Sequence, residues 1–84
     1  MVANYIVVKD LGRERAIVFD GLISHKKMAE LFDKKKIVSA GMVNLTPHNK
    51  DRHAVCFGGS SELDLNFRRE DNDVVALSLN LKNV

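Results

Sequence analysis

The sequence predicts an α+β domain in which an antiparallel sheet of about five strands carries two helices packed on one face. Two β-branched runs near the start of the chain flank a glycine turn, a pattern typical of a hairpin. An amphipathic stripe in the first half of the chain and an acidic segment in the second half favour two helices. The elements are therefore expected in the order ββαβββα.

The first two strands are expected at residues 4–9 and 15–19. Both runs are rich in β-branched and aromatic side chains. Gly12 lies between them, and glycine readily adopts the positive φ that a tight turn requires. The two strands are thus expected to pair as an antiparallel hairpin.

A helix is predicted at residues 25–35. Ser24 is a good N-cap, because its hydroxyl oxygen accepts a hydrogen bond from a free backbone N–H group of the first turn. Met28, Leu31 and Phe32 form an apolar stripe at helical spacing. Lysines at 34–36 fall in the last turn, where cations interact favourably with the helix dipole.

Three further strands are expected before the second helix. They are placed at 37–45, 53–57 and 63–67, separated by a loop at 46–52 and a break at 58–61. Gly41 lies inside the first of these strands, where a glycine suggests a bulge or the close approach of another group.

The C-terminal segment permits two interpretations. Apolar residues alternate from Val75 to Leu81, as they would in a strand. Acidic residues at 70, 71 and 73 instead favour the N-terminus of a helix. We prefer a helix at residues 71–80 and keep the strand as the alternative.

The composition is that of one globular domain spanning residues 1–84. Hydrophobic residues make up 45% of the chain and charged residues 29%, which excludes a disordered polymer. No apolar run approaches the roughly 18 residues of a membrane span, and the first residues lack the features of a signal peptide, so no membrane partner is expected. Cys56 is the only cysteine, which favours the reducing cytoplasm.

The length of the chain favours self-association. A domain of this size buries only about 60–65% of the surface that its unfolded form exposes. The chain has no tryptophan, one tyrosine and four phenylalanines, so large rings contribute little to the core. We therefore expect a homodimer or a higher homo-oligomer, with a tightly packed aliphatic monomer as the alternative.

The sequence shows no set of catalytic residues. Cys56 would act as a nucleophile only if a histidine reached it. His53 lies three residues away on the same predicted strand and so on the opposite face, which leaves His48 or His25. A small buried hydrophobic residue is the favoured interpretation of Cys56. Cys56 and the three histidines lack the paired spacing of a zinc site, so no metal or other cofactor is expected.

A basic surface is the candidate nucleic-acid-binding site. It consists of Lys26, Lys27, Lys34, Lys35 and Lys36, all within the predicted helix at 25–36. The first turn of a helix disfavours cations, and a phosphate partner would compensate for this. Glu30 and Asp33 interrupt the lysines, however, and no aromatic residues are interleaved for base stacking. A solvated face with its own ion pairs is therefore the favoured interpretation.

Several segments resemble a known family. They are Ala16-Ile17-Val18-Phe19 running into Leu22-Ile23-Ser24-His25, then Ile37-Val38-Ser39-Ala40-Gly41 before a cysteine-containing strand that ends at Gly58, and Arg69-Glu70-Asp71. In these segments the chain is similar to a family of short, uncharacterised proteins of bacteria and their phages. The resemblance implies a protein associated with bacteria, a phage or a mobile element, and a helix that starts near Arg-Glu-Asp. It implies no activity and no functional residue.

The absence of a catalytic pattern decides the functional prediction. The sequence favours a non-enzymatic, homo-oligomeric binding or adaptor protein, which recognises a protein partner or holds a ligand between subunits. A nucleic-acid binder that uses the basic helix is the first alternative. A small enzyme that depends on Cys56 is the second alternative.

Overall fold

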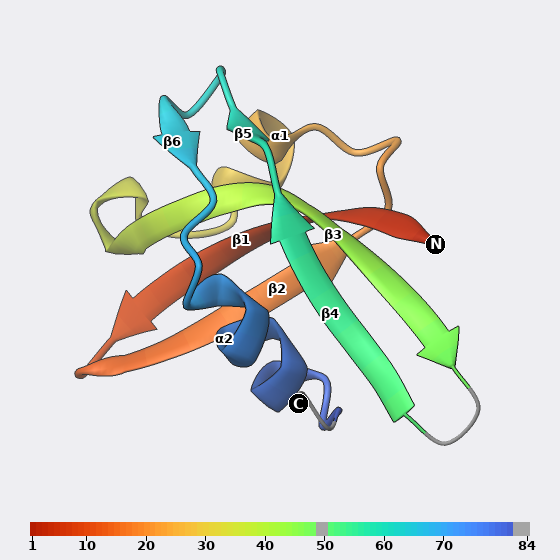
Figure 1. The fold of residues 1–84 in the computed structure, drawn as a ribbon. Coiled ribbons are helices and arrows are strands. Elements are labelled where there is room, and N and C mark those ends of the chain that lie inside the picture. The colour runs from red at the N-terminus through yellow and green to blue at the C-terminus, as the bar shows by residue number, and fades with distance from the viewer. Residues whose placement is uncertain (49–50, 82–84) are drawn as a thin grey trace.

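Four antiparallel strands form the main sheet, in the order β2-β1-β3-β4 (Figure 1). The computed structural model of the protein describes residues 1–48 and 51–81. The main strands are β1 (Val2–Asp10), β2 (Arg13–Phe19), β3 (Ile37–His48) and β4 (Asp51–Phe57). The other elements are α1 (His25–Ala29), the 3₁₀ helix η1 (Lys34–Lys36), β5 (Gly59–Ser60), β6 (Leu65–Asn66) and α2 (Asp71–Ser78). The predicted α+β class and the order ββαβββα are confirmed.

The first hairpin confirms the two strands that open the predicted order and extends each of them by a few residues. β1 and β2 pair as far as Asp10 and Arg13, which leaves a two-residue turn of Leu11 and Gly12. Both turn residues have positive φ, 53° at Leu11 and 78° at Gly12, as in the tightest hairpin turns. Gly12 adopts this conformation freely, as predicted, whereas Leu11 adopts it against a steric penalty.

Helix α1 begins where the sequence predicts. The Oγ atom of Ser24 accepts a hydrogen bond from the backbone N–H of Lys27 at 3.1 Å, so Ser24 is the N-cap. The predicted end at residue 35 is wrong, because α1 ends at Ala29.

The segment after α1 forms a separate turn for a local reason. The carboxylate of Asp33 accepts a hydrogen bond from the backbone N–H of Lys35 at 3.0 Å and so caps η1. An aspartate that bonds its neighbouring backbone in this way competes with a continuous helix. Apolar spacing around Leu31 and Phe32 therefore predicted more helix than the chain forms.

Strands β3 and β4 extend into the predicted loop at 46–52. They remain paired as far as His48 and Asp51, so the prediction of a loop over the whole segment is wrong. Residues 49–50, which were part of that prediction, lie outside the described residues. Cross-strand pairing overrides the local preference of this polar segment. Pro47 is tolerated because β1 begins at Val2 and does not extend alongside this end of β3.

The predicted strand at 63–67 is reduced to the two residues of β6. This strand pairs with β5 in a small second sheet against β3, so the main sheet has four strands instead of about five. Asp64 has a φ of 54°, which a strand residue does not adopt, and it ends the pairing on the N-terminal side.

Helix α2 confirms the helical interpretation of the C-terminal segment, although it ends at Ser78 and not at residue 80. Val75 is fully buried, whereas Leu77 is 81% exposed. Residues two positions apart would share a face in a strand but point in different directions in a helix. The strand alternative is thereby excluded.

The two helices pack on opposite faces of the main sheet, so the prediction that both lie on one face is wrong (Figure 1). Tyr5 and Val7 belong to the cluster beneath α2, whereas Ile6 and Val8 belong to the cluster that includes Ala29 of α1. The physical reason lies in β1, where all four of these residues are buried although successive side chains point to opposite faces. Both faces of this central strand therefore require a cover.

The chain forms one compact α+β domain. Its Cα radius of gyration is 12.0 Å, which matches the value of about 12 Å expected for a folded chain of this length. Within residues 1–48 and 51–81, none of the helices has the length and apolar character needed to cross a membrane.

Candidate functional site

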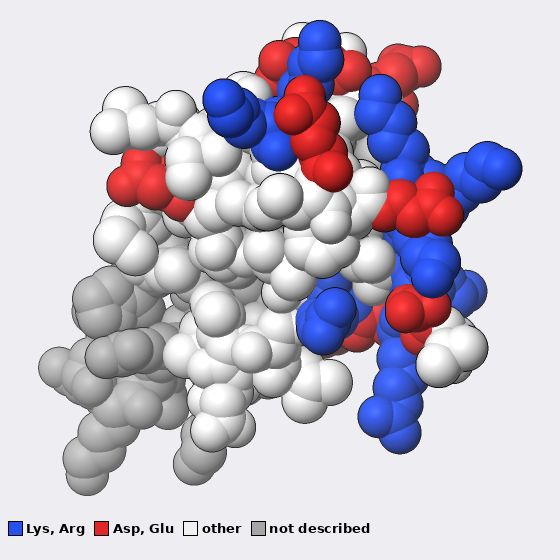
Figure 2. Space-filling view, turned by 180° about the vertical axis from the view of Figure 1, so that it is seen from behind, with Lys and Arg blue, Asp and Glu red and all other residues white. Residues whose placement is uncertain are grey.

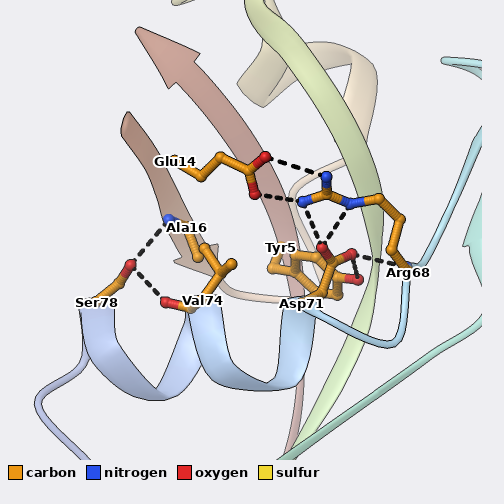
Figure 3. A network of polar contacts seen from close by, with 7 residues as sticks. All are labelled: Tyr5, Glu14, Ala16, Arg68, Asp71, Val74 and Ser78. Carbon is orange, nitrogen blue, oxygen red and sulfur yellow. Dashed lines mark hydrogen bonds and ion pairs between the residues drawn. The ribbon is translucent and has the colours of Figure 1, made fainter. Parts of the chain in front are cut away.

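A buried polar network joins the start of α2 to the main sheet (Figure 3). The fully buried carboxylate of Asp71 accepts a hydrogen bond of 2.6 Å from the hydroxyl of Tyr5. It accepts two more, each of 2.9 Å, from the backbone N–H and the Nε–H of Arg68. The guanidinium of Arg68 also donates to both carboxylate oxygens of Glu14, at 2.6 and 3.2 Å. The network thus links β1, β2 and the N-terminus of α2.

The electrostatics of this network favour stability over proton transfer. Burial and the hydrogen bond to Asp71 raise the pKa of Tyr5 well above its ordinary value. Hydrogen bonds from Arg68 lower the pKa of Glu14, and hydrogen bonds to Glu14 and Asp71 raise the pKa of Arg68. Each of these three shifts reinforces the protonation state that the group already has at neutral pH. None of the three is therefore placed to act as an acid or a base in a reaction.

Sequence reasoning did not find this network. It used Asp71 as an acid at a helix start and Tyr5 as a strand residue, without joining them. One signal was present, because a tyrosine in the apolar run of residues 5–8 predicts a buried hydroxyl in need of a partner. The identity of the partner depends on tertiary packing.

Helix α2 also protects hydrogen-bonding groups on both outer strands. The amide oxygen of Asn72 accepts a hydrogen bond of 2.7 Å from the backbone N–H of Cys56 on β4. At the other end of the helix, the hydroxyl of Ser78 accepts one of 2.9 Å from the backbone N–H of Ala16 on β2. These two side-chain hydrogen bonds occupy backbone N–H groups of the edge strands, which another strand could otherwise use to add to the sheet.

Cys56 has the surroundings of a core residue. Its side chain is buried in the cluster beneath α2, where it interacts with Tyr5. Burial raises the pKa of the thiol to about 11, so little thiolate is present at neutral pH. His53 points to the opposite face of β4, and His25 lies on the other side of the main sheet beside Phe19. Neither histidine is placed to act as a base toward Cys56.

The histidines do not form a metal site in the described part of the chain. His25 is buried, and its Nε2–H donates a hydrogen bond of 2.8 Å to the carbonyl of Gly41. This bond makes His25 a link between α1 and β3. The side chain of His48 lies outside the described residues. Among the residues that the structure describes, no group of three histidine, cysteine, aspartate or glutamate side chains is arranged to hold a metal ion.

The lysines of the predicted basic helix lie on two separate elements. Lys26 and Lys27 belong to α1, and Lys34, Lys35 and Lys36 form η1. All five side chains are exposed. The Nζ atom of Lys36 lies 3.0 Å from a carboxylate oxygen of Asp10, which raises the pKa of this lysine. One continuous basic helix over residues 25–36 is therefore not formed, because α1 ends at Ala29 and Asp33 starts a separate 3₁₀ turn.

Part of the sheet face on the α1 side is left uncovered by the helix. We call this surface the open face; it consists of Val2, Asn4, Met42, Asn44, Val55 and Phe57. The strand register arranges these residues in two rows of three across β1, β3 and β4. Val2 is 56% exposed, Val55 52% and Phe57 39%. Figure 2 views the molecule from this side, with charged side chains concentrated at the top and along one edge and uncharged side chains over much of the rest.

The loop before α1 borders the open face. The side-chain amide of Asn4 donates a hydrogen bond of 3.0 Å to the carbonyl of Ile23. The loop therefore lies directly beside Asn4 at the edge of the open face. Leu22, in the same loop, is almost fully exposed. Leu22 and Ile23 also line a shallow depression of about 650 Å³, together with Met28 and Leu31. The exposed apolar surface thus continues from the sheet onto α1.

Comparison with known proteins adds no relative: no family model, curated protein or solved structure matches this chain. The resemblance to short bacterial and phage proteins stays a prediction, and the functional argument depends on the geometry of the molecule.

Proposed function

We propose that the protein is a non-enzymatic binding or adaptor protein that acts as a homodimer, in which the open faces of two copies meet. The observation that carries this proposal is the exposure of Val2, Val55 and Phe57 among the six residues of the open face, none of which is charged. Contiguous exposed apolar surfaces on small domains mark interaction sites.

The chemistry of the open face suits a second copy of the same chain. A twofold interface brings the same patch of both copies together, so charges of one sign would repel one another. The open face has no lysine, arginine, aspartate or glutamate. It does contain the exposed Asn44, whose side-chain amide offers both a donor and an acceptor to polar groups of another copy.

Two further features support a non-enzymatic role. The polar network around Asp71 has its hydrogen bonds satisfied internally and connects secondary-structure elements. The thiol of Cys56 is buried with a raised pKa, which opposes formation of the nucleophile that a cysteine enzyme needs.

Sedimentation velocity of Val55→Lys tests the proposal. The wild-type chain is expected to sediment as a dimer at micromolar concentration, and the variant as a monomer. A lysine that each copy buries without a partner at the interface should weaken association by more than about tenfold. Val55 is half exposed in a single chain, so the same substitution should leave the monomer folded.

Leu77→Lys is the matched control. It also replaces an exposed aliphatic side chain by lysine, but on α2, across the sheet from the open face. The control is expected to remain dimeric. A wild-type chain that stays monomeric throughout the micromolar range, or a control that dissociates as readily as Val55→Lys, would contradict the proposal.

A further inference from the structure

The tip of the β1–β2 hairpin carries an apolar side chain in an unfavourable position. Leu11 is 97% exposed and has a φ of 53°. Asparagine or glycine adopts this backbone conformation more readily, and a leucine at this place buries almost nothing within the chain. Neither backbone geometry nor packing within the domain accounts for a leucine here.

Cations surround this leucine. Lys9 and Arg13 lie on the two strands that lead into the turn, and both are exposed. The ion pair between Lys36 and Asp10 places η1 beside the turn, so Lys34 and Lys35 belong to the same end of the molecule. In Figure 2, the Lys and Arg side chains along one edge, with Asp and Glu side chains among them, lie where Figure 1 shows η1 and the β1–β2 turn.

Three of the acidic residues nearby are already engaged, and a fourth, Glu62, is exposed and lines the same pocket as Lys34. Asp10 pairs with Lys36, Glu14 pairs with Arg68, and Asp33 accepts a hydrogen bond from the backbone of η1. Within residues 1–48 and 51–81, none of Lys9, Arg13, Lys34 and Lys35 forms an ion pair within 4.0 Å, although Lys9 lies opposite Glu14 on the hairpin and interacts with it electrostatically. We call these four cations together with Leu11 the basic end.

We propose that the basic end binds duplex DNA, with the β1–β2 hairpin in the major groove and the lysines of η1 on the phosphate backbone. The major groove is about 12 Å wide and admits a two-stranded β-ribbon. Unpaired lysines and arginines bind phosphates and release counterions. An exposed leucine at the tip of the ribbon contacts the apolar parts of the base edges, such as the thymine methyl group. The site lies at the other end of β1 from Val2 of the open face and does not depend on the dimer.

An anionic membrane is the competing partner, and the basic end fits it less well. Membrane-surface segments combine their cations with several apolar side chains that enter the lipid together. Leu11 is the only apolar residue in the segment from Lys9 to Arg13, and η1 consists of three lysines. The apolar area at the basic end is thus too small for stable insertion.

Fluorescence anisotropy with a labelled DNA duplex, in a series of salt concentrations, tests the proposal. The logarithm of the association constant should fall with the logarithm of the salt concentration, with a slope of about −0.9 for each phosphate contacted. The double variant Lys34→Gln/Lys35→Gln should bind at least about tenfold more weakly and reduce the size of this slope by about 2.

The matched control is Lys26→Gln/Lys27→Gln. It removes the same charge from α1, which lies outside the basic end. The control should bind DNA within about twofold of the wild type. An equal loss of binding in the two double variants would overturn the proposal, because general attraction by positive charge would then explain the binding.

Leu11→Asn tests the role of the hairpin tip. Asparagine tolerates the positive φ of this turn, so the variant should be at least as stable as the wild type. We expect it to bind DNA several-fold more weakly with an unchanged salt slope, because the cations remain. Unchanged affinity for DNA in this variant would overturn the proposal. So would equal binding of the wild type to an RNA duplex, whose major groove is too narrow for a β-ribbon. Binding to anionic vesicles and not to DNA would also overturn it.

Discussion

The hydroxyl of Tyr5 donates a hydrogen bond of 2.6 Å to the carboxylate of Asp71, which lies 66 residues further along the chain. Tyr5 belongs to β1 in the interior of the main sheet, and Asp71 is the first residue of α2. Both side chains are fully buried. This contact fixes the position at which α2 begins above the sheet, and Arg68 extends the link to Glu14 on β2.

Tyr5→Phe removes this hydrogen bond and the interaction of the hydroxyl with the Cys56 thiol, and little else. The ring that packs beneath α2 remains, while Asp71 loses one of its donors in a site without access to water. We expect the free energy of unfolding to fall by about 1–3 kcal/mol, the effect typical of an unsatisfied buried polar group. Urea denaturation measures it. A loss below about 0.5 kcal/mol would show that the Arg68 donors alone satisfy the carboxylate.

Two adjacent arginines allow a matched test of the ion pairs. Arg68→Ala leaves Glu14 and the buried Asp71 without their cation, whereas Arg69 is exposed. We expect Arg68→Ala to lower the free energy of unfolding by about 2–3 kcal/mol, less than for a fully buried pair because Arg68 is partly exposed. Arg69→Ala should change it by less than about 0.5 kcal/mol. Equal effects of the two substitutions would contradict the role assigned to Arg68.

Local chemistry was sufficient to predict the order of the elements. The β-branched runs that form β1 and β2, the Ser24 cap of α1 and the acidic start of α2 each act over a few residues. The errors arise where distant segments decide the outcome. Cross-strand pairing extends β3 and β4 into the expected loop, and burial of the run at residues 5–8 on both sides places the helices on opposite faces.

The candidate sites were less predictable than the fold. The open face depends on which part of the sheet α1 leaves uncovered, and this is decided by the packing of α1 over Ile6 and Val8 and not over Val2. The sequence alone shows the lysines at 34–36 as a basic group, but their position near the β1–β2 turn depends on the packing of η1 against β1. Tyr5 and Asp71 meet only in the folded chain.

Alkaline pH should destabilise the protein through Cys56. The pKa of its thiol is about 11 in the folded chain against an ordinary value of 9.0, so the unfolded chain loses this proton first. The contribution of the protonated Cys56 thiol to the free energy of unfolding is therefore complete below pH 9.0. It is lost as the pH rises to about 11. Two pKa units correspond to about 3 kcal/mol. Urea denaturation at a series of pH values measures this decline.

Cys56→Ala separates the two buried acids that contribute at high pH. The pKa of Tyr5 is also raised, from an ordinary value of 10.0, so its contribution to stability declines only above that pH. In the variant, the fall in the free energy of unfolding should therefore begin about one pH unit higher than in the wild type. An unchanged onset would mean that the Cys56 thiol does not contribute to the decline.

Gly41 occupies a position where the sequence predicts a bulge or a close approach, and the structure shows the close approach. A Cβ atom at Gly41 would lie 2.7 Å from the carbonyl oxygen of Phe57 and 3.3 Å from the ring of Tyr5. We expect Gly41→Ala to lower the free energy of unfolding by about 1–3 kcal/mol, because the backbone of β4 would have to move. A Cβ atom at Gly21 would meet no atom within 4 Å, so Gly21→Ala is the control and should be neutral or slightly stabilising. If Gly41→Ala were as stable as this control, the backbone of β4 would have to be able to shift away from β3, which would contradict the close approach of the two strands at this position.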